Sequence, residues 1–370
     1  MLNQLHGQPE SYEKKAKYKF GRTLGAGTYG VVREAESPEG KVAIKIILKK
    51  SVKNNEQMVY DELHLLQRLK HPHIVKFVDW FESRDKFYIV TQLATGGELF
   101  DRICDQGRFT EKDASQTIKQ VLEAVNYLHD NNVVHRDLKP ENLIYVTSDS
   151  DSDLVLADFG IAKTLDSSQD SLNTMAGSFG YAAPEVMAKQ GHGKPVDMWS
   201  LGVITYTLLC GYSPFRSENL TDLLDECTKG SVIFHERYWR DVSEDAKDFI
   251  NCLIVPDPEQ RWTSEKAMGH IWLTGHAVPD HDLGPKMKEK LREEVERRRA
   301  VRERFKNAIL TVSLQNLGSG PDDGQKLHKV VMAMKNRKAE EDAENLEAAE
   351  AESTESGSAV GRNTTSTSSI

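Results

Sequence analysis

A glycine-rich segment near the N-terminus has the spacing of a phosphate-binding loop. Residues 24–32 read LGAGTYGVV, with three glycines on the pattern G-x-G-x-x-G. A dinucleotide-binding loop would lead into a helix and a P-loop would end in Gly-Lys-Ser or Gly-Lys-Thr, whereas strand-like residues flank this segment on both sides. We therefore expect a hairpin that covers nucleotide phosphates, although the motif alone could be a chance glycine-rich turn. The residues assigned to nucleotide binding here are Leu24, Gly25, Ala26, Gly27, Thr28, Tyr29, Gly30, Val31 and Val32.

One strand later, a single lysine follows an apolar run. Lys45 ends the sequence VAIK, and a lone lysine on a strand usually faces solvent. A carboxylate partner would hold it inward, and an ammonium held in this way can present its charge to the α- and β-phosphates. Glu62 lies ten residues before Pro72 on the helical stretch that follows, whereas Glu56 comes a turn or more too early. We therefore expect an ion pair between Lys45 and Glu62, which places both at the nucleotide site.

Three further motifs follow along the chain. They are HRDLKPEN at 135–142, DFG at 158–160 and APE at 183–185. In this order, after a glycine-rich loop and a strand lysine, they resemble the protein kinase family over roughly residues 18–274. The resemblance implies an α+β, bilobal protein kinase fold, in which a small β-rich N-lobe holds one key helix and a larger C-lobe is helical.

The resemblance also assigns roles in phosphoryl transfer to the polar residues of these motifs. By likeness to the family, Asp137 orients the substrate hydroxyl and accepts its proton, and Lys139 neutralises charge on the moving γ-phosphoryl group. Asn142 and Asp158 would hold Mg²⁺ against the phosphates of ATP. The adenine pocket would be formed by Val32, Ala43, the gatekeeper Thr91 and the hinge residues Gln92, Leu93 and Ala94.

Two residues of the helical lobe receive structural roles from the same resemblance. Asp197 begins the sequence DMWSLG, which is similar to the buried helix that anchors the catalytic loop of kinases. Arg261 is placed to pair with Glu185 of the APE motif. Neither residue is expected to contact the substrate.

Finer motifs narrow the resemblance to one group of kinases. Lys139, two residues after Asp137, is typical of serine/threonine kinases. The sequences GGELFDRI at 96–103 and CGYSPF at 210–215 look like the calcium/calmodulin-dependent protein kinase group, and in particular its type I-like branch. This likeness implies protein substrates phosphorylated on Ser or Thr, in which Glu98 binds an arginine three residues before the acceptor.

The segment between the DFG and APE motifs is expected to carry a regulatory site. Thr174 lies four residues before Ser178, at the position that matches the activation-loop phosphosite of the family. A phosphate there adds close to two negative charges and could organise the loop on Arg136. An upstream activating kinase would then be a partner, and the alternative is that Thr174 is a plain loop residue.

Beyond the kinase-like region, the sequence turns basic. Residues 286–306 hold ten Lys or Arg against five Asp or Glu. Val301, Phe305, Leu310 and Leu314, at relative positions 1, 5, 10 and 14, are expected to lie mostly along one helical stripe. A basic helix with bulky anchors is what calcium-loaded calmodulin binds, and the same helix would block the substrate groove until calmodulin removes it. The plain alternative is a solvated helix that caps the lower lobe, and a weaker basic stretch, KLHKVVMAMKNRK, follows at 326–338.

Two other functions compete with this interpretation. A catalytically dead pseudokinase could act as a calmodulin-responsive scaffold, but Lys45, Asp137, Asn142 and Asp158 are all intact. A kinase of the same group could instead be controlled by phosphorylation alone, in which case the basic helix binds another partner.

The elements that must position these residues fit the chain's length. At 370 residues, the chain exceeds what one hydrophobic core usually serves. Short β-rich runs from Tyr18 to Gln92 surround a helical stretch at 57–69, and helical periodicity dominates residues 97–275. The polar insertion SDSDSD at 148–153, between two short β-like runs, is expected to form a solvated hairpin rather than a metal site. We therefore expect a flexible N-terminus at 1–17, a kinase domain at 18–274, an autoinhibitory and calmodulin-binding segment at 275–317 and a disordered acidic tail at 318–370.

Composition excludes several other classes of protein. The net charge of −9 argues against generic nucleic-acid binding, and the longest apolar stretches are too short for a membrane helix. Four cysteines without a C-x-x-C pair indicate neither a disulfide framework nor a zinc site. We expect a cytoplasmic monomer, with nuclear entry left open.

Overall fold

The computed structural model describes residues 8–26, 30–52, 56–160, 162–164, 179–217, 219–229, 232–275 and 278–316. Residues up to Arg297 form one compact unit, and the rest of the chain forms a second, which is described by itself. The predictions for the glycine-rich tip at 27–29, for Thr174 and for the acidic tail at 318–370 concern residues outside the described ones.

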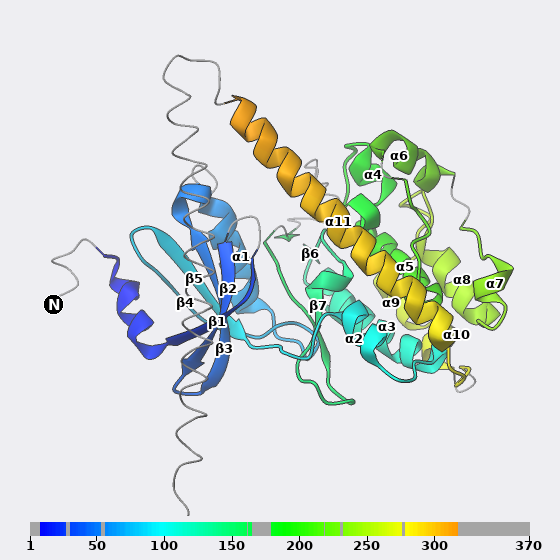
Figure 1. Cartoon of the computed structure of the whole chain (residues 1–370), viewed down its shortest axis with the longest axis horizontal. Coiled ribbons are helices and arrows are strands. Elements are labelled where there is room, and N and C mark those ends of the chain that lie inside the picture. Colours follow the sequence, from blue (N-terminus) through cyan, green and yellow to red (C-terminus); the bar gives the residue numbers. More distant parts are fainter. Residues whose placement is uncertain are drawn as a thin grey trace, which may run out of the picture. The chain divides into compact units, whose positions relative to one another are not determined.

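The N-lobe is a five-stranded antiparallel sheet with one long helix (Figure 1). The strand order is β1-β2-β3-β5-β4. Along β3, Val42, Ile44 and Ile46 face one cluster of buried side chains, and Ile47 belongs to the cluster that includes helix α1. Because side chains alternate between the two faces of a strand, Lys45 is directed to the α1 face. The bounds are β1 Lys19–Ala26, β2 Gly30–Ser37, β3 Gly40–Leu48, α1 Glu56–Arg68, β4 Phe77–Glu82 and β5 Lys86–Gln92.

The C-lobe is mostly helical and is built around α5, whose side chains are buried on nearly every side. Helix α5 packs against α3 and α8, and α3 also contacts α9 (Figure 1). Among the helices of the described residues, none is both long and apolar enough to cross a lipid bilayer. The helices are α2 Leu99–Asp105, α3 Glu111–Asp130, α4 Pro184–Met187, α5 Pro195–Cys210, α6 Leu220–Thr228, α7 Glu236–Trp239, α8 Glu244–Leu253, α9 Ser264–Met268, α10 Ile271–Thr274 and α11 Gly284–Asn316.

Four short strands pair as two two-stranded sheets and flank the HRDLKPEN and DFG motifs. The polar insertion SDSDSD lies in a hairpin between β7 and β8, as its composition predicts. Strand β6 pairs with β9, which follows the DFG motif. The bounds are β6 Val133–Val134, β7 Leu143–Tyr145, β8 Leu154–Leu156 and β9 Lys163–Thr164.

The structure differs from the expectation of a flexible segment at 1–17. Glu10–Lys17 form a 3-10 helix that is attached to β4. The Lys14 ammonium lies 2.6 Å from Asp79, and the Ser11 hydroxyl accepts a hydrogen bond from the backbone N–H of Glu82. These long-range contacts fix the segment, and nothing in the local composition announces them.

The first turns of α11 belong to the C-lobe. Met287 and Leu291 are buried, and the Lys288 ammonium donates to the backbone oxygens of Gln106 and Gly107 at 2.9 and 2.7 Å. At the end of α5, Gly211 has φ +86°, and a Cβ there would lie 2.3 Å from the backbone oxygen of Met287. Only glycine therefore allows α11 to approach this closely.

Candidate active site

An ion pair from strand β3 forms the centre of the site. The Lys45 ammonium lies 2.7 Å from Glu62 on α1 and 2.9 Å from Asp158 of the DFG motif. Burial alone would lower the pKa of Lys45, but the two carboxylates raise it above its ordinary value. Lys45 in turn lowers the pKa of Asp158 to about 2, against the opposing effect of burial. The predicted Lys45–Glu62 pair is thus confirmed, and the low pKa of Asp158 keeps that carboxylate charged at neutral pH.

The loop at 135–142 brings three polar side chains together. The Lys139 ammonium lies 2.5 Å from Oδ2 of Asp137. The Asn142 side-chain amide donates to the backbone oxygen of Asp137 at 2.8 Å, which directs its Oδ1 away from that bond. The site therefore holds a carboxylate, an amide oxygen and an ammonium in one place.

Helix α5 holds this loop through a buried carboxylate. Both oxygens of Asp197 accept backbone N–H bonds at 2.9 Å, one from His135 and one from Arg136. Burial would raise the pKa of Asp197, but the hydrogen bond from His129 and these amides hold it below its ordinary value. The anchoring role expected of Asp197 is therefore seen in its contacts.

Two residues of the site have a left-handed backbone. Arg136 has φ 67° and Asp158 has φ 63°, although neither is glycine. Such conformations cost free energy, and they persist only where surrounding contacts impose them. The contacts are the Asp197 bond to Arg136 and the Lys45 bond to Asp158. Phe159 is buried against the His135 ring, with 5.1 Å between ring centroids.

The described ends of the glycine-rich segment form the hairpin of β1 and β2. Gly25 and Ala26 pair with Val32 and Val31. At Gly30, a Cβ would lie 1.8 Å from the backbone oxygen of Ile46, so this glycine is needed for strand pairing.

The residues predicted to form the adenine pocket lie on neighbouring strands of the N-lobe sheet and in the segment that follows β5. Ala43 pairs with Thr91 in the ladder between β3 and β5, and the hinge follows at the end of β5. Within the described residues, the backbone N–H of Ala94 donates to no other backbone group, whereas that of Thr95 donates to Val146. This amide is therefore a possible donor to a purine edge.

The remaining predicted residues are only partly described. Glu98 is the N-cap residue of α2, with partial exposure. The anchors Val301, Phe305, Leu310 and Leu314 lie on the helical backbone of α11, and their side chains lie outside the described residues. The single stripe expected of them is wrong, because residues 305 and 314 are nine positions apart, about two and a half turns. Residues 301 and 305 share one face of the helix, and residues 310 and 314 share the opposite face.

Sequence reasoning missed some residues that hold the site. His129 bonds the buried Asp197 at 3.0 Å, and a histidine among the apolar positions at the end of α3 was the only sign of it. Arg292 donates to the backbone oxygen of Cys104 at the end of α2, although the sequence assigned it to the regulatory segment.

The predicted pair of Glu185 and Arg261 is confirmed as a buried, bidentate ion pair. The distances are 2.7 and 3.1 Å, and the two side chains are 3% and 0% exposed. We predict that Glu185→Gln destabilises the fold by about 3–5 kcal/mol, because it leaves the Arg261 charge buried without its partner. Urea unfolding measures this, with Glu244→Gln as a control. Glu244 pairs with Lys247 while 89% exposed, so its loss should cost about 0–1 kcal/mol. Similar costs for both variants would contradict the prediction.

Comparisons with known proteins agree with this geometry. Residues 18–273 match the family model of the protein kinase domain. A calcium/calmodulin-dependent protein kinase of Metarhizium anisopliae is 75% identical over 85% of this chain and 80% of its own length. One from Emericella nidulans is 69% identical over 85% and 74%, and a type 1 enzyme of Macrobrachium nipponense is 48% identical over 75% and 80%. The chain belongs to the protein kinase family, and within it to the calcium/calmodulin-dependent protein kinases.

Proposed function

We propose that this chain transfers the γ-phosphate of ATP to Ser or Thr in proteins, and that calcium-loaded calmodulin switches it on. The observation that carries the proposal is a pair of adjacent clusters, Lys45 with Glu62 and Asp158, and Asp137 with Lys139 and Asn142. The backbone N–H of Ala157, next to Asp158, donates to the backbone oxygen of Asn142 at 2.8 Å and so links the two segments. Phosphoryl transfer needs mainly positioning and charge stabilisation, which this cluster can supply.

The residues of the chain fit the cation that protein kinases use. Mg²⁺ prefers oxygen ligands, and Asp158 and Asn142 offer a charged carboxylate and an amide oxygen in the same site. We infer that these two residues hold it. When bound, Mg²⁺ neutralises charge on the phosphates.

The other polar residues would act on the reacting groups directly. Asp137 orients the substrate hydroxyl and takes its proton, and the Lys139 ammonium at 2.5 Å holds its carboxylate in position. Lys139 then neutralises charge on the transferred group. Lys45 holds the α- and β-phosphates, and the Ala94 amide with the Gln92 carbonyl binds the purine edge.

Substrate choice is proposed to depend on Glu98. It precedes α2 on the C-lobe, with its side chain partly exposed. A carboxylate at this position can attract an arginine of the substrate, as the GGELFDRI motif implies.

Calmodulin is proposed to bind the far part of α11. This helix continues to Asn316 and is strongly basic. Two pairs of apolar anchors on opposite faces suit a partner with two Met-rich grooves, because each groove can take one pair. Before calmodulin binds, residues 298–316 would block the substrate groove and so inhibit the kinase.

A peptide phosphorylation assay tests the whole proposal. The full chain should phosphorylate a Ser peptide with Arg at the third position before the acceptor, and calcium with calmodulin should increase the rate. No transfer under any condition would favour the pseudokinase scaffold. A rate of transfer that does not change when calcium and calmodulin are added would favour control by phosphorylation alone.

Activation is expected to need a second input at Thr174. We predict that Thr174→Ala binds calmodulin normally but reaches a low maximal rate, because it lacks the phosphate that would organise the loop on Arg136. Rates are measured before and after treatment with an upstream activating kinase. Ser171→Ala, three residues earlier in the same segment, is the matched control. Full stimulation of Thr174→Ala would contradict the prediction.

The calmodulin anchors can be tested at one position. We predict that Phe305→Asp weakens calmodulin binding at least tenfold, because burying a large apolar side chain contributes roughly 1.5–3 kcal/mol. Fluorescence anisotropy with labelled calmodulin measures the affinity, and Asn307→Asp introduces the same charge at a position outside the four anchors. If Phe305→Asp bound calmodulin normally, the calmodulin-binding site would be assigned to residues 326–338 instead.

A further inference from the structure

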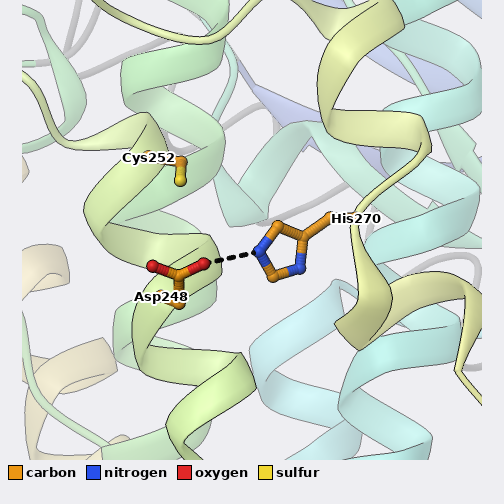
Figure 2. A group of neighbouring side chains, drawn as sticks. All are labelled: Asp248, Cys252 and His270. Atoms are coloured by element: carbon orange, nitrogen blue, oxygen red, sulfur yellow. Dashed lines mark hydrogen bonds and ion pairs between the residues drawn. The ribbon is translucent and has the colours of Figure 1, made fainter.

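Three potential metal ligands of different chemistry meet on the C-lobe, apart from the residues of the active site. Asp248 and Cys252 come from α8, and His270 is the N-cap residue of α10. One ligand atom from each lies within 4.8 Å of the other two. Figure 2 shows the carboxylate and the thiol on one helix, with the imidazole facing them from the segment before α10.

The positions of these atoms come from regular structure. Residues four apart on a helix share a face, so α8 presents Asp248 and Cys252 together. Nε2 of His270 lies 3.1 Å from Oδ2 of Asp248 (Figure 2). With bonds of about 2.0–2.3 Å, two ligands of a tetrahedral Zn²⁺ are separated by about 3.3–3.6 Å. The imidazole and carboxylate are therefore already at nearly this separation, and a small movement of the thiol would complete the set.

The surroundings fix one ligand and leave another open to solvent. The His270 side chain is 4% exposed and packs beside the rings of Phe249 and Trp262, at centroid distances of 5.2 and 5.6 Å. The Asp248 side chain is 70% exposed. A cation here would thus have a rigid imidazole on its inner side and room for water on its outer side, as in zinc sites with three protein ligands.

We propose that Asp248, Cys252 and His270 form a Zn²⁺ site that links α8 to the segment preceding α10, a site that the spacing of the cysteines alone did not indicate. Imidazole and thiolate ligands suit zinc and other transition metals, whereas Mg²⁺ and Ca²⁺ take oxygen ligands. The site does not depend on the proposed response to calmodulin, because none of its residues lies in α11 or in the active site.

The hydrogen bonds of His270 set the expected strength of binding. The backbone N–H of Trp272 donates to Nδ1 at 3.1 Å, so the neutral ring carries its proton on Nε2 and donates it to Asp248. Coordination through Nε2 moves this proton to Nδ1 and replaces the Trp272 bond, while the thiol loses its proton to solvent. Because an N-cap bond is lost, we expect an affinity on the order of micromolar, weaker than in zinc-dependent folds.

Metal titration of the full chain tests the proposal. The full chain is dialysed to equilibrium against Zn²⁺ in a buffer that contains no other divalent metal. At equal free zinc, the wild type should bind one more ion than Cys252→Ser. Loss of this direct ligand should weaken that site at least as much as loss of an outer-shell partner, about 10–100-fold. Titration with Co²⁺ should give a thiolate-to-cobalt charge-transfer absorption in the wild type.

Two further variants separate the proposal from misfolding and from general acidity. Asp248→Asn changes an exposed side chain and should also weaken zinc binding, with an unchanged unfolding transition in the absence of metal. Asp245→Asn, an exposed acid one turn earlier on α8, should bind zinc and cobalt as the wild type does. Equal zinc stoichiometry and affinity in wild type and Cys252→Ser, or a cobalt spectrum without the thiolate band, would overturn the proposal.

Discussion

Replacing Asp137 by Asn should abolish most phosphoryl transfer while ATP binding stays nearly intact. The amide cannot accept the proton of the substrate hydroxyl, and help from a general base is typically worth about 10²–10⁴-fold. Asparagine has the same shape as aspartate, and its Oδ1 can still accept from Lys139, which lies 2.5 Å from Asp137. The loss should therefore appear in kcat on a peptide substrate, with little change in KM for ATP.

A second measurement separates chemistry from binding. A ligand that binds only the folded state raises its stability, so Mg-ATP should raise Tm equally in wild type and Asp137→Asn. Lys45→Ala is the contrasting variant, because it removes the ammonium proposed to hold the phosphates and should reduce both turnover and the shift in Tm. Wild-type turnover in both variants would show that the catalytic assignment is wrong.

The parts of this site that sequence predicts well are those that follow from local periodicity and motif order. The alternation of β3 and the helical position of Glu62 were enough to predict its bond to Lys45, which measures 2.7 Å. The hairpin between β7 and β8 likewise followed from two short apolar runs around a polar insertion. In each case the contact joins two elements that are close in sequence and whose own period the residues display.

The missed features depend on contacts between distant segments. The left-handed backbone of Arg136 and Asp158 is imposed by Asp197 and Lys45, which lie 61 and 113 residues away. Residue type does not reveal such a constraint at Arg136, because arginine is not among the residues enriched at positive φ. Aspartate is enriched there, but most aspartates have negative φ, so Asp158 alone does not predict it either. The 3-10 helix at Glu10–Lys17 is held in the same way, through Asp79 on β4.

The boundary of the regulatory segment also depends on contacts between distant segments, which the sequence does not display. Basic residues and a helical period run through α11 without interruption, so the sequence pattern placed the whole helix in the regulatory segment at 275–317. The first turns are instead part of the C-lobe, where Leu291 is fully buried and Lys288 bonds the loop after α2. The Lys288 ammonium makes hydrogen bonds within the C-lobe. A count of basic residues cannot distinguish such a lysine from one that binds calmodulin.

This boundary leads to a prediction about two truncations. A chain that ends at Arg297 should be active without calcium, because it keeps the packed turns of α11 and lacks residues 298–316. Coupling between regulatory and active sites is typically 1–3 kcal/mol, so the rate without calcium should rise about 5–150-fold over the full chain. A chain that ends at Leu283 should lose stability as well, because Met287 and Leu291 are buried side chains worth roughly 1.5–3 kcal/mol each.

Thermal unfolding and peptide assays on both truncations distinguish packing from inhibition. The chain ending at Arg297 should unfold at the temperature of the full chain, whereas the one ending at Leu283 should unfold several degrees lower. Leu291→Ala in the full chain is the matched control. It should cost about 2–5 kcal/mol of stability but leave calmodulin affinity unchanged, because residue 291 precedes all four proposed anchors. If activity still depended on calcium after truncation at Arg297, the inhibitory segment would lie within the packed turns of α11. The proposal that residues 298–316 inhibit the enzyme would then be wrong.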